Sequence, residues 1–579
     1  MTAVAHEGAR RATWRDRELR AGPIALSLPA ALGLLVLFVA PLVTFFVYSF
    51  LTAGLFAVSG PVTLENYKDV VTSGVNGTLA LNSFYVGLAA ATVTVLVALP
   101  IAYWLRYCAG RSQTTVLFLI TATLFASYLV RIYAWRTILG ENGLLNSGLR
   151  ELGLIDDSLG FLLFNRFAVT VALVHIFLPY VVLVLYAGFR PISPALLEGA
   201  QDLGGGVVTR WRKVVLPLIA APLVTSFLFV FILSASDYVT PQFLGGTSGA
   251  MLGRRIQEAL TGQGNFPLGA AMAFLMLAAF VICYLLTAAG LRTLRLNRIR
   301  FVEVAPAPAN QRSPFAAAVL VLALVFLFVP LVVVVLFSFH KTGALSFPFQ
   351  GFSTRWYEEV FSSFEFRQAL KNSAIVASVV AAVTLVLATA AAYGLSRMRS
   401  RFRAPMSLLF FLPITLPGLF LGISMLVFFS RIDLKLSLTT VVLAHLVYVF
   451  PYFLLIAVAA LDRLDPALEE SASDLGASPW VVFRRVTLPQ IWPLLVGATS
   501  LAFALSFDEF IITFFVIGSD STLPMYIWSS LRRTVDPSIN TISTLLMAIT
   551  LLLWVVTFVF TVHSARSRRR ATAPLLAEA

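Results

Sequence analysis

Long apolar runs constrain this 579-residue chain more than any other feature. A helix needs about 20 apolar residues to cross the hydrocarbon core of a bilayer, and helices satisfy their backbone polar groups internally there. With 59% hydrophobic and 12% charged residues, the chain is too poor in charge for soluble domains of this length. We therefore predict an all-α polytopic membrane protein with twelve transmembrane helices. The runs fall at roughly 24–51, 83–105, 114–138, 166–189, 214–236, 268–291, 314–339, 373–395, 405–430, 438–460, 490–517 and 541–562.

The positions of Lys and Arg predict the orientation. Cytoplasmic loops of membrane proteins carry an excess of Lys and Arg. With the N-terminus inside, most basic residues fall in cytoplasmic segments, whereas the outer loop 140–164 is net acidic. We expect cytoplasmic tails at 1–22 and 564–579, and attribute the net charge of +14 to topology and not to nucleic-acid binding.

A polar segment within this apolar chain occurs twice, 272 positions apart. The first copy, from Pro194 to Pro217, reads PALLEGAQDLGGGVVTRWRKVVLP, and the second, from Pro466 to Pro489, reads PALEESASDLGASPWVVFRRVTLP. The copies align without a gap, and the predicted orientation places both in the cytoplasm. A polar surface built twice on one side of a membrane suggests a docking site for a two-fold partner.

The repeat extends upstream of this segment. LNSFYVGLAAATVTVLVALPIAYWL, from Leu81, is similar to KNSAIVASVVAAVTLVLATAAAYGL, from Lys371, at an offset of 290. Because each half starts inside and crosses an even number of times, we predict two parallel six-helix repeats, related by a pseudo-two-fold axis along the membrane normal. They span 23–296 and 313–563, and 297–312 is the cytoplasmic linker.

The doubled segment has the local signals of a short helix. A proline suits the first turn, and the acidic residues four positions apart lie on one helical face. Gly204 and Gly476 are placed to end these helices in the left-handed conformation, and Ser478-Pro479 begins a further helix. We predict a helix parallel to the membrane that exposes carboxylates. A single copy fits an interfacial connecting loop equally well, but two matched copies favour a docking surface.

The segment resembles the EAA loop in permease subunits of ABC importers that use a binding protein. EGA and ESA stand where that family has Glu-Ala-Ala, so both copies depart at the second position. The resemblance implies a coupling helix in each half, seated on an ATP-binding subunit. The chain contains no GxxxxGK[ST] phosphate-binding pattern, so the resemblance implies a separate pair of ATPase subunits. The implied coupling residues are Glu198, Gly199, Ala200, Asp202, Gly204, Glu470, Ser471, Ala472, Asp474 and Gly476.

Other segments resemble the two permeases of spermidine/putrescine importers. YLVRIYAWRTILGENGLLN from Tyr128 and SASDYVTPQFLGG from Ser234 are similar to the first permease, and SFDEFIITFFVIGSDSTLPMYIWS from Ser506 to the second. The resemblance covers nearly the whole chain, as if two subunits were fused. It implies a bacterial inner-membrane permease that works with an extracytoplasmic solute-binding protein and moves a small polyamine-like solute. Ferric iron or another solute remains an alternative, because related permeases carry other solutes.

Carboxylates beside the spanning runs are candidates for a cation route. Asp237 coincides with Glu509 at the 272 offset, and Asp508 adjoins Glu509. Ionisable residues at membrane depth are costly and often mark pathways or paired sites. They could instead cap their helices or pair with Arg131 or Arg136. Aromatic residues that could offer cation–π faces, or could be interfacial belt residues, are Tyr128, Tyr133, Trp135 and Tyr238.

The remaining sequence features indicate no covalent chemistry. His175 and His445 precede prolines in corresponding runs, where helix packing is favoured over a proton relay. We predict no catalytic residue, no metal site and no cofactor. Two rival classes are a secondary transporter driven by an ion gradient and a membrane scaffold. The doubled cytoplasmic segment argues against the first, and the paired carboxylates are unexplained by the second.

Overall fold

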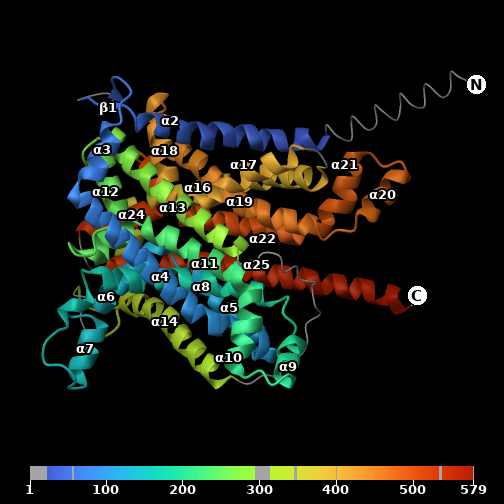
Figure 1. Cartoon of the computed structure of the whole chain (residues 1–579), viewed down its shortest axis with the longest axis horizontal. Helices are drawn as coiled ribbons and strands as arrows, with labels where there is room; N and C mark the ends of the chain where they lie inside the picture. The colour runs from blue at the N-terminus through green and yellow to red at the C-terminus, as the bar shows by residue number, and fades with distance from the viewer. Residues whose placement is uncertain are drawn as a thin grey trace, which may run out of the picture. The chain divides into compact units, whose positions relative to one another are not determined.

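The computed structural model describes residues 22–54, 58–293, 313–343, 349–398, 401–533 and 537–577. The predicted linker 297–312 and, except for its last residue, the predicted tail 1–22 lie outside these ranges. Within them, ten helices are long and apolar enough to cross a membrane, or up to twelve if each of two bent pairs is one span. The predicted all-α polytopic fold is confirmed (Figure 1).

Two expected spans are not straight helices. In the spans predicted at 114–138 and 405–430, the chain bends by 92° between Gly110–Phe125 and Tyr128–Glu151 and by 104° between Arg403–Thr415 and Gly418–Arg431. Pro417 explains the second break, because it lacks an N–H and forces the residue before it out of the helical region. Leu416 is accordingly extended, with ψ 135°. The first break has no proline, yet Ser127 is equally extended, with ψ 142°.

The helices of the first half of the sequence follow the predicted runs closely. Their bounds are Gly22–Tyr48 (including η1 Leu35–Val39 and α2 Ala40–Tyr48), α3 Glu65–Thr72, α4 Gly74–Tyr107, η2 Gly110–Ser112, α5 Gln113–Ala122, η3 Thr123–Phe125, α6 Tyr128–Leu139, α7 Leu144–Glu151, η4 Gly160–Leu162, α8 Arg166–Phe189, α9 Pro194–Asp202, α10 Val207–Arg210, η5 Trp211–Val215, α11 Leu216–Ala235, η6 Pro241–Gly245, α12 Leu252–Gln257, η7 Glu258–Gly262 and α13 Phe266–Thr293. Strands β1 Thr52–Ala53 and β2 Val58–Ser59 form one antiparallel pair.

The second half repeats this order of elements. Its bounds are α14 Pro314–Ser338, α15 Arg355–Ser362, α16 Phe364–Arg397, α17 Arg403–Thr415, α18 Gly418–Arg431, α19 Leu438–Leu461, α20 Pro466–Asp474, α21 Pro479–Val482, η9 Phe483–Thr487, α22 Leu488–Phe507, α23 Thr513–Val516, α24 Leu523–Arg533 and α25 Pro537–Ala577.

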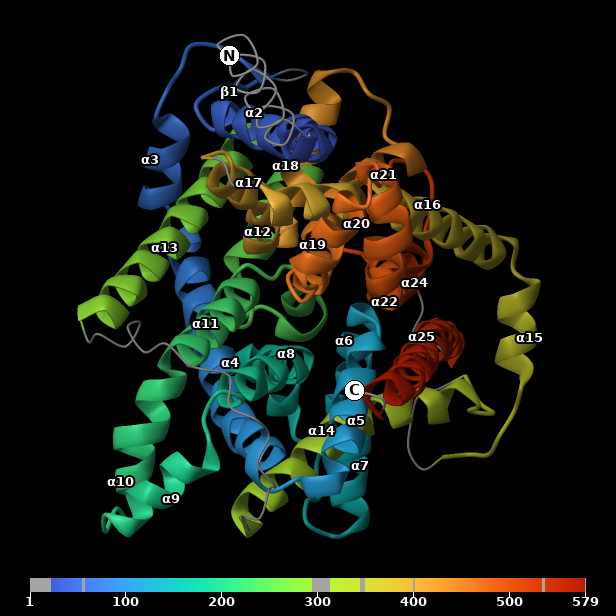
Figure 2. The same ribbon diagram turned by 90° about the vertical axis from the view of Figure 1, so that its right-hand side faces the viewer.

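The chain forms two compact units. In the first, which comprises 1–45, 363–526 and 548–579, α16 lies against both α19 and α22 (Figure 2). The face of α16 that they cover is rich in small buried residues, including Ala377, Ala381, Ala388 and Ala391. Small side chains let helix backbones approach closely, which is how helices associate in the absence of a hydrophobic driving force.

The second unit, which comprises 46–362 and 527–547, uses the same construction. Here α4 packs against α8, α11 and α14, again through small buried residues. A Cβ atom on Gly87 of α4 would lie 2.9 Å from the Cβ of Ala235 in α11, so this position leaves no room for a side chain.

The units differ from the predicted halves 23–296 and 313–563 in the placement of the first helix of each half and of residues 527–547. The Ser27 hydroxyl lies 3.5 Å from the carbonyl oxygen of Ala391, so the first helix contacts the second half. Conversely, α14 packs against α4 and α6 of the first half. Each first helix therefore buries its apolar face on the other half of the sequence, although the halves remain our prediction for the repeat itself.

The matched Asn-Ser pair of the upstream repeat has the same role in both units. The amide of Asn82 donates to the carbonyl oxygen of Ala250 (3.0 Å), and the Ser83 hydroxyl accepts from the Leu252 N–H (3.0 Å) at the start of α12. In the other unit, Asn372 donates to the Ser521 carbonyl (2.8 Å), and the hydroxyl next to it accepts from the first N–H of α24 (2.8 Å). These polar residues lie within the long apolar helices α4 and α16 and bond to backbone groups at or just before the starts of the short helices α12 and α24.

The repeat also extends further upstream than the sequence match indicated. The Ser49 hydroxyl and the Tyr67 hydroxyl lie 2.7 Å apart, and Ser338 and Tyr357 repeat this contact at 2.8 Å. Both pairs join the end of a spanning helix to the short helix that follows it, α3 or α15.

Candidate functional site

The doubled segment forms the same two helices in both copies. Helices α9 and α20 have nine residues each, begin with proline and end at the aligned Asp202 and Asp474. Figure 1 shows α20 beyond the ends of α19 and α22 in one unit, and α9 beyond the end of α8 in the other. The predicted short helix is confirmed in both copies.

Both helices end in the predicted left-handed glycine. Gly204 has φ +79° and Gly476 has φ +86°. The next residue then donates back to the last turn, Gly205 to the carbonyl oxygen of Ala200 (2.9 Å) and Ala477 to that of Ala472 (3.2 Å). These bonds satisfy carbonyl groups that a helix end otherwise leaves open. The two chain reversals are therefore built alike.

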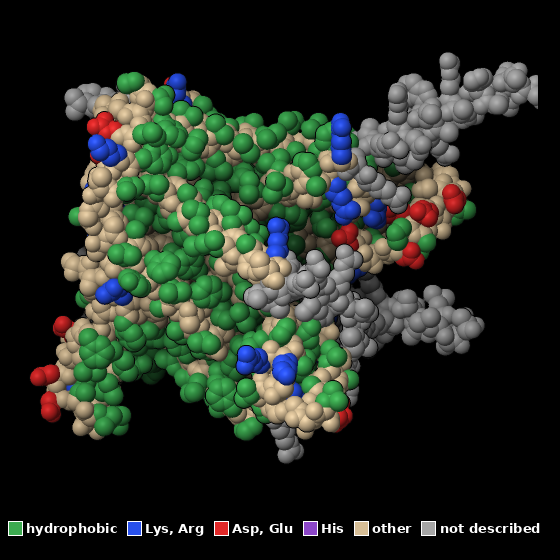
Figure 3. Space-filling view, in the orientation of Figure 1, with side chains coloured by type: hydrophobic (Ala, Val, Ile, Leu, Met, Phe, Trp, Pro, Cys, Tyr) green, Lys and Arg blue, Asp and Glu red, His purple; other side chains and the backbone are tan. Residues whose placement is uncertain are grey.

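The surface of these helices combines acidic and apolar side chains. Glu198 and Asp202 are exposed in α9, as are Glu470 and Asp474 in α20. Acidic side chains gather over α20 in the space-filling view (Figure 3). Exposed leucines occupy matched positions as well, and sequence reasoning missed them: Leu196 (50% exposed), Leu203 (90%), Leu468 (49%) and Leu475 (89%). The sequence did contain a signal for these leucines, because leucine occurs in both copies at each of the two aligned positions.

A π-helical turn and an aromatic pair support each helix. The turns η5 and η9 coincide at the 272 offset and end just before Leu-Pro. A proline cannot donate to the carbonyl four residues earlier, and its ring clashes with that carbonyl, which favours such a widened turn. The first aromatic residue of the turn packs on a tyrosine of the long helix, Trp211 on Tyr103 (centroids 5.3 Å apart) and Phe483 on Tyr393 (5.2 Å).

Helix α20 is also held by an ion pair. Arg397 donates from Nε to Oε2 and from Nη2 to Oε1 of Glu469, both at 2.9 Å, and the Thr487 hydroxyl donates to Oε1 at 2.6 Å. Burial favours a raised pKa for Glu469, but the hydrogen bonds from Arg397 and Thr487 and the guanidinium charge outweigh it. The pKa of Glu469 therefore lies below its ordinary value.

Asp237 is buried, and its carboxylate caps the turn that follows α11. It accepts the N–H of Val239 (3.0 Å) and of Thr240 (3.3 Å) and the hydroxyl of Tyr128 (2.7 Å). These bonds supply the capping role that the sequence left open. The side chain of Arg131 donates to the carbonyl oxygen of Ile176 (3.3 Å), among its other interactions.

Glu509 caps the corresponding turn of the other unit. It accepts the N–H of Ile512 (2.8 Å) and both the N–H (2.9 Å) and the hydroxyl (3.0 Å) of Thr513. His445 lies 3.4 Å from its Oε2 and contacts the hydroxyls of Ser506 and Thr513, both at 2.8 Å. Asp508, by contrast, is only partly buried. Asp237 and Glu509 belong to different units.

The candidate aromatic residues lie inside their unit. Tyr133 and Tyr238 are each 1% exposed, and Trp135 is 8% exposed. The Trp135 ring packs on His175 (centroids 5.8 Å apart) and on Phe326 (5.3 Å). His175 also contacts the Leu327 carbonyl oxygen at 3.1 Å. These contacts join α6 and α8 to α14 and fit the packing role that the sequence favoured for this histidine.

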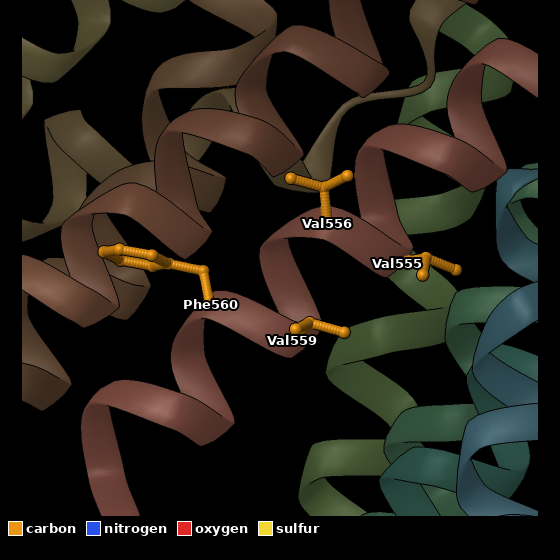
Figure 4. Close-up of a pocket in the computed structure, with 4 residues that line it drawn as sticks. All are labelled: Val555, Val556, Val559 and Phe560. Carbon is orange, nitrogen blue, oxygen red and sulfur yellow. The ribbon is translucent and has the colours of Figure 1, made fainter. Parts of the chain in front are cut away.

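One surface hollow offers no chemistry for a solute. It is shallow and lined by Val555, Val556, Val559 and Phe560 of α25 (Figure 4). With only apolar side chains around it, this hollow is typical of a surface that faces lipid.

The fold and the doubled helices define a class of polytopic membrane transport protein, and comparison with known proteins identifies its family. Residues 382–570 match the family described as "Binding-protein-dependent transport system inner membrane component". The chain is 33% identical over 245 residues to the putrescine transport system permease protein PotI of Escherichia coli strain K12, covering 41% of this chain and 86% of the relative.

Two further relatives are spermidine/putrescine transport system permease proteins of Haemophilus influenzae. PotC is 29% identical over 40% of this chain and 90% of its own length, and PotB is 27% identical over 39% and 79%. Each relative therefore accounts for about 40% of this chain, which leaves room for two permease lengths.

The chain belongs to the family of binding-protein-dependent transport system inner membrane components. It is a multi-pass inner-membrane permease of the ABC importer type, and a transport subunit of this kind is not itself an enzyme. The resemblance to the permeases of spermidine/putrescine importers is confirmed.

Proposed function

We propose that this chain carries two permease halves in one polypeptide and imports a polyamine or a related organic cation. Helices α9 and α20 are its two coupling helices, each contacting one ATPase subunit in the cytoplasm. Both termini are cytoplasmic, and a solute-binding protein delivers the solute on the outer side.

The observation that carries this proposal is the equal construction of α9 and α20. Two helices of the same length expose matched carboxylates and matched leucines and end in matched positive-φ glycines. A connecting loop needs neither an exposed Leu475 nor an exposed Glu470. A partner with an apolar cleft and a cation at its rim accommodates both, because such a contact removes leucine surface from water and pairs the carboxylate.

The mechanism follows from the linkage between the two sides of the membrane. ATP binding draws the two ATPase subunits together, and the coupling helices move with them. The bundle then shifts from an inward-facing to an outward-facing population, so ATP acts far from the solute. ATP hydrolysis lets the two ATPase subunits move apart from each other, and the helices return to the inward-facing state.

The polyamine assignment is supported by the names of the relatives and by one carboxylate in particular. PotI, PotC and PotB are putrescine or spermidine/putrescine permeases. The half-buried Asp508 is our candidate for the solute contact, because Asp237 and Glu509 are buried and accept hydrogen bonds from their own turns. Tyr128, Tyr133, Trp135 and Tyr238 are the aromatic candidates of the other unit.

Replacing both exposed glutamates tests the coupling assignment. Glu198→Ala with Glu470→Ala should reduce co-purification of the ATPase and abolish coupled uptake, because each removes a charge-assisted contact of about 1.5–3 kcal/mol. Asp156→Ala with Asp157→Ala is the matched control, since these exposed carboxylates lie on the loop that we place outside. Unchanged uptake in the glutamate variant, with normal membrane insertion, would remove the coupling role.

The solute is tested separately on the cognate receptor. Calorimetric titration of that receptor with spermidine and putrescine should give binding. If it binds neither but the coupling variant is inactive, the chain is an importer of another solute.

A further inference from the structure

The ion pair between Arg397 and Glu469 lies on the inner side of the coupling helix α20 and links this helix to two other segments of the chain. Arg397 is the last residue of α16, Glu469 is the fourth residue of α20, and Thr487 ends the π-helical turn η9. The guanidinium contacts both carboxylate oxygens at 2.9 Å, and the hydroxyl adds a third bond at 2.6 Å. The side chains are only partly exposed, 25% for Arg397 and 15% for Glu469.

This geometry fixes the rotation of α20 about its own axis. A two-pronged contact between a guanidinium and a carboxylate restrains direction as well as distance. Glu470 is the next residue along the helix, and successive residues project about 100° apart. With Glu469 held inward, Glu470 must project to the side, where it is exposed. The exposed carboxylate of the coupling surface therefore takes its direction from its buried neighbour.

The first half replaces every member of this cluster by an apolar or aromatic residue. At the 272 offset Glu469 corresponds to Leu197 and Thr487 to Val215, and at the 290 offset Arg397 corresponds to Tyr107. Leu197 (3% exposed) and Tyr107 (1%) are more deeply buried than Glu469 and Arg397, whereas Val215 (1%) and Thr487 (0%) are equally buried. The Tyr107 hydroxyl donates to the carbonyl oxygen of Ile192 at 3.1 Å, in the segment just before α9.

The three positions at which the halves differ belong to one cluster in the second half, because Arg397 and Thr487 both bond to Glu469. A lone leucine opposite Arg397 would leave a guanidinium without its carboxylate, and a lone glutamate at the position of Leu197, which is 3% exposed, would bury a charge. Either mixture is costly because a buried charge needs a partner. The two halves therefore contain two self-consistent sets that occupy the same positions beneath the coupling helix.

We propose that Arg397, Glu469 and Thr487 position the second coupling helix, and that Tyr107, Leu197 and Val215 do the same for the first. Glu469 and Arg397 are positioning residues, and they act through Glu470 without touching the ATPase. What the coupling helix requires is a matched set, polar or apolar, and not the charge itself. This inference rests on the proposed function, in which α20 contacts an ATPase subunit.

The test uses the full-length permease in proteoliposomes with its ATPase subunits, and measures ATPase affinity and permease-stimulated ATP hydrolysis. Neither readout needs a known solute. Glu469→Gln keeps the shape but loses the ion pair, and should weaken ATPase affinity about tenfold, the equivalent of one charge-assisted bond. Arg397→Gln should do the same.

Rescue variants separate positioning from general damage. The triple change Arg397→Tyr, Glu469→Leu and Thr487→Val copies the apolar set and should restore affinity to within about threefold of wild type, a tolerance of less than 1 kcal/mol. Exchange of the charges, Arg397→Glu with Glu469→Arg, should recover part of the loss. Thermal unfolding of each purified variant reports whether it is folded.

The outcomes are distinguishable. If Glu470→Ala weakens ATPase binding but Glu469→Gln does not, the positioning role is overturned and the coupling role stands. If Glu470→Ala also has no effect, the proposed function fails first. If the triple variant is folded but remains as weak as Glu469→Gln, the charge itself is required and the equivalence of the two sets is wrong.

Discussion

The exposed leucines of the two coupling helices allow the sharpest quantitative prediction. Leu203 is 90% exposed and Leu475 is 89% exposed, and each adjoins the glycine that ends its helix. Full burial of a leucine side chain is worth about 1.5–3 kcal/mol. If each enters an apolar cleft of an ATPase subunit, Leu203→Ser with Leu475→Ser should weaken that contact by about this amount on each side.

The loss converts directly into affinity. Since about 1.4 kcal/mol corresponds to a tenfold change, each site should lose about tenfold to a hundredfold in Kd for its ATPase subunit. Because each leucine is proposed to contact its own ATPase subunit, the two losses should add, so the double variant should bind a linked ATPase pair at least about a hundredfold more weakly.

The measurement is a titration of purified ATPase into permease held in lipid nanodiscs, without solute. Leu154→Ser is the matched control, because Leu154 is 67% exposed but lies in the loop 140–164. A Kd for the double variant that stays within threefold of wild type would refute burial of these leucines at the ATPase contact. Equal weakening by the control would show a general effect of surface leucines instead.

Three further predictions follow from single sites. Because the folded-state pKa of Glu469 is depressed, its stabilising contribution is complete above the unfolded value of about 4.3 and is lost as pH falls through the folded value. The thermal midpoint of purified wild type should therefore fall more between pH 5 and pH 3 than that of the triple apolar variant, and equal falls would contradict the argument. Asp508→Asn should lower the rate of putrescine uptake more than Glu509→Gln does, whereas Glu509→Gln should lower the thermal midpoint more, through its buried cap; the opposite pattern in uptake and unfolding assays would exchange the two roles. Gly476→Ala should cost about 1 kcal/mol in unfolding free energy because of its positive φ, whereas Gly199→Ala, in a helix interior with open space around it, should not destabilise.

The coupling segment was predictable from sequence because its signals are local. Proline at the first turn, glycine after the last turn and acidic residues four apart specify a short helix without reference to the rest of the chain. The observed bounds of α9 and α20 match that prediction. The roles of the membrane-depth carboxylates were harder to assign, because a carboxylate beside a spanning run can face a solute or its own backbone.

A signal for the capping role was nonetheless present. Asp237 precedes Thr240 by three positions and Glu509 precedes Thr513 by four, and in both units the N–H of that threonine donates to the carboxylate. Short acidic side chains commonly bond to backbone N–H groups a few residues ahead. The break before Tyr128, in contrast, has no proline or glycine to mark it, and it depends on tertiary contacts that a single sequence does not display.

The most informative sequence signal was the combination of two offsets. Tyr103 matches Tyr393 at 290 and Trp211 matches Phe483 at 272, and the structure brings each tyrosine against the aromatic residue of its own half. Because the two offsets differ, the number of residues between the tyrosine and the aromatic residue is not the same in the two halves. Their contact in both halves therefore reflects a shared tertiary fold and not a shared local spacing. The same comparison isolates the positions where the halves disagree. Three positions with different residue types in the two halves, those of Arg397, Glu469 and Thr487, meet at one contact. This indicates that the residues supporting the coupling helix are polar in the second half and apolar or aromatic in the first.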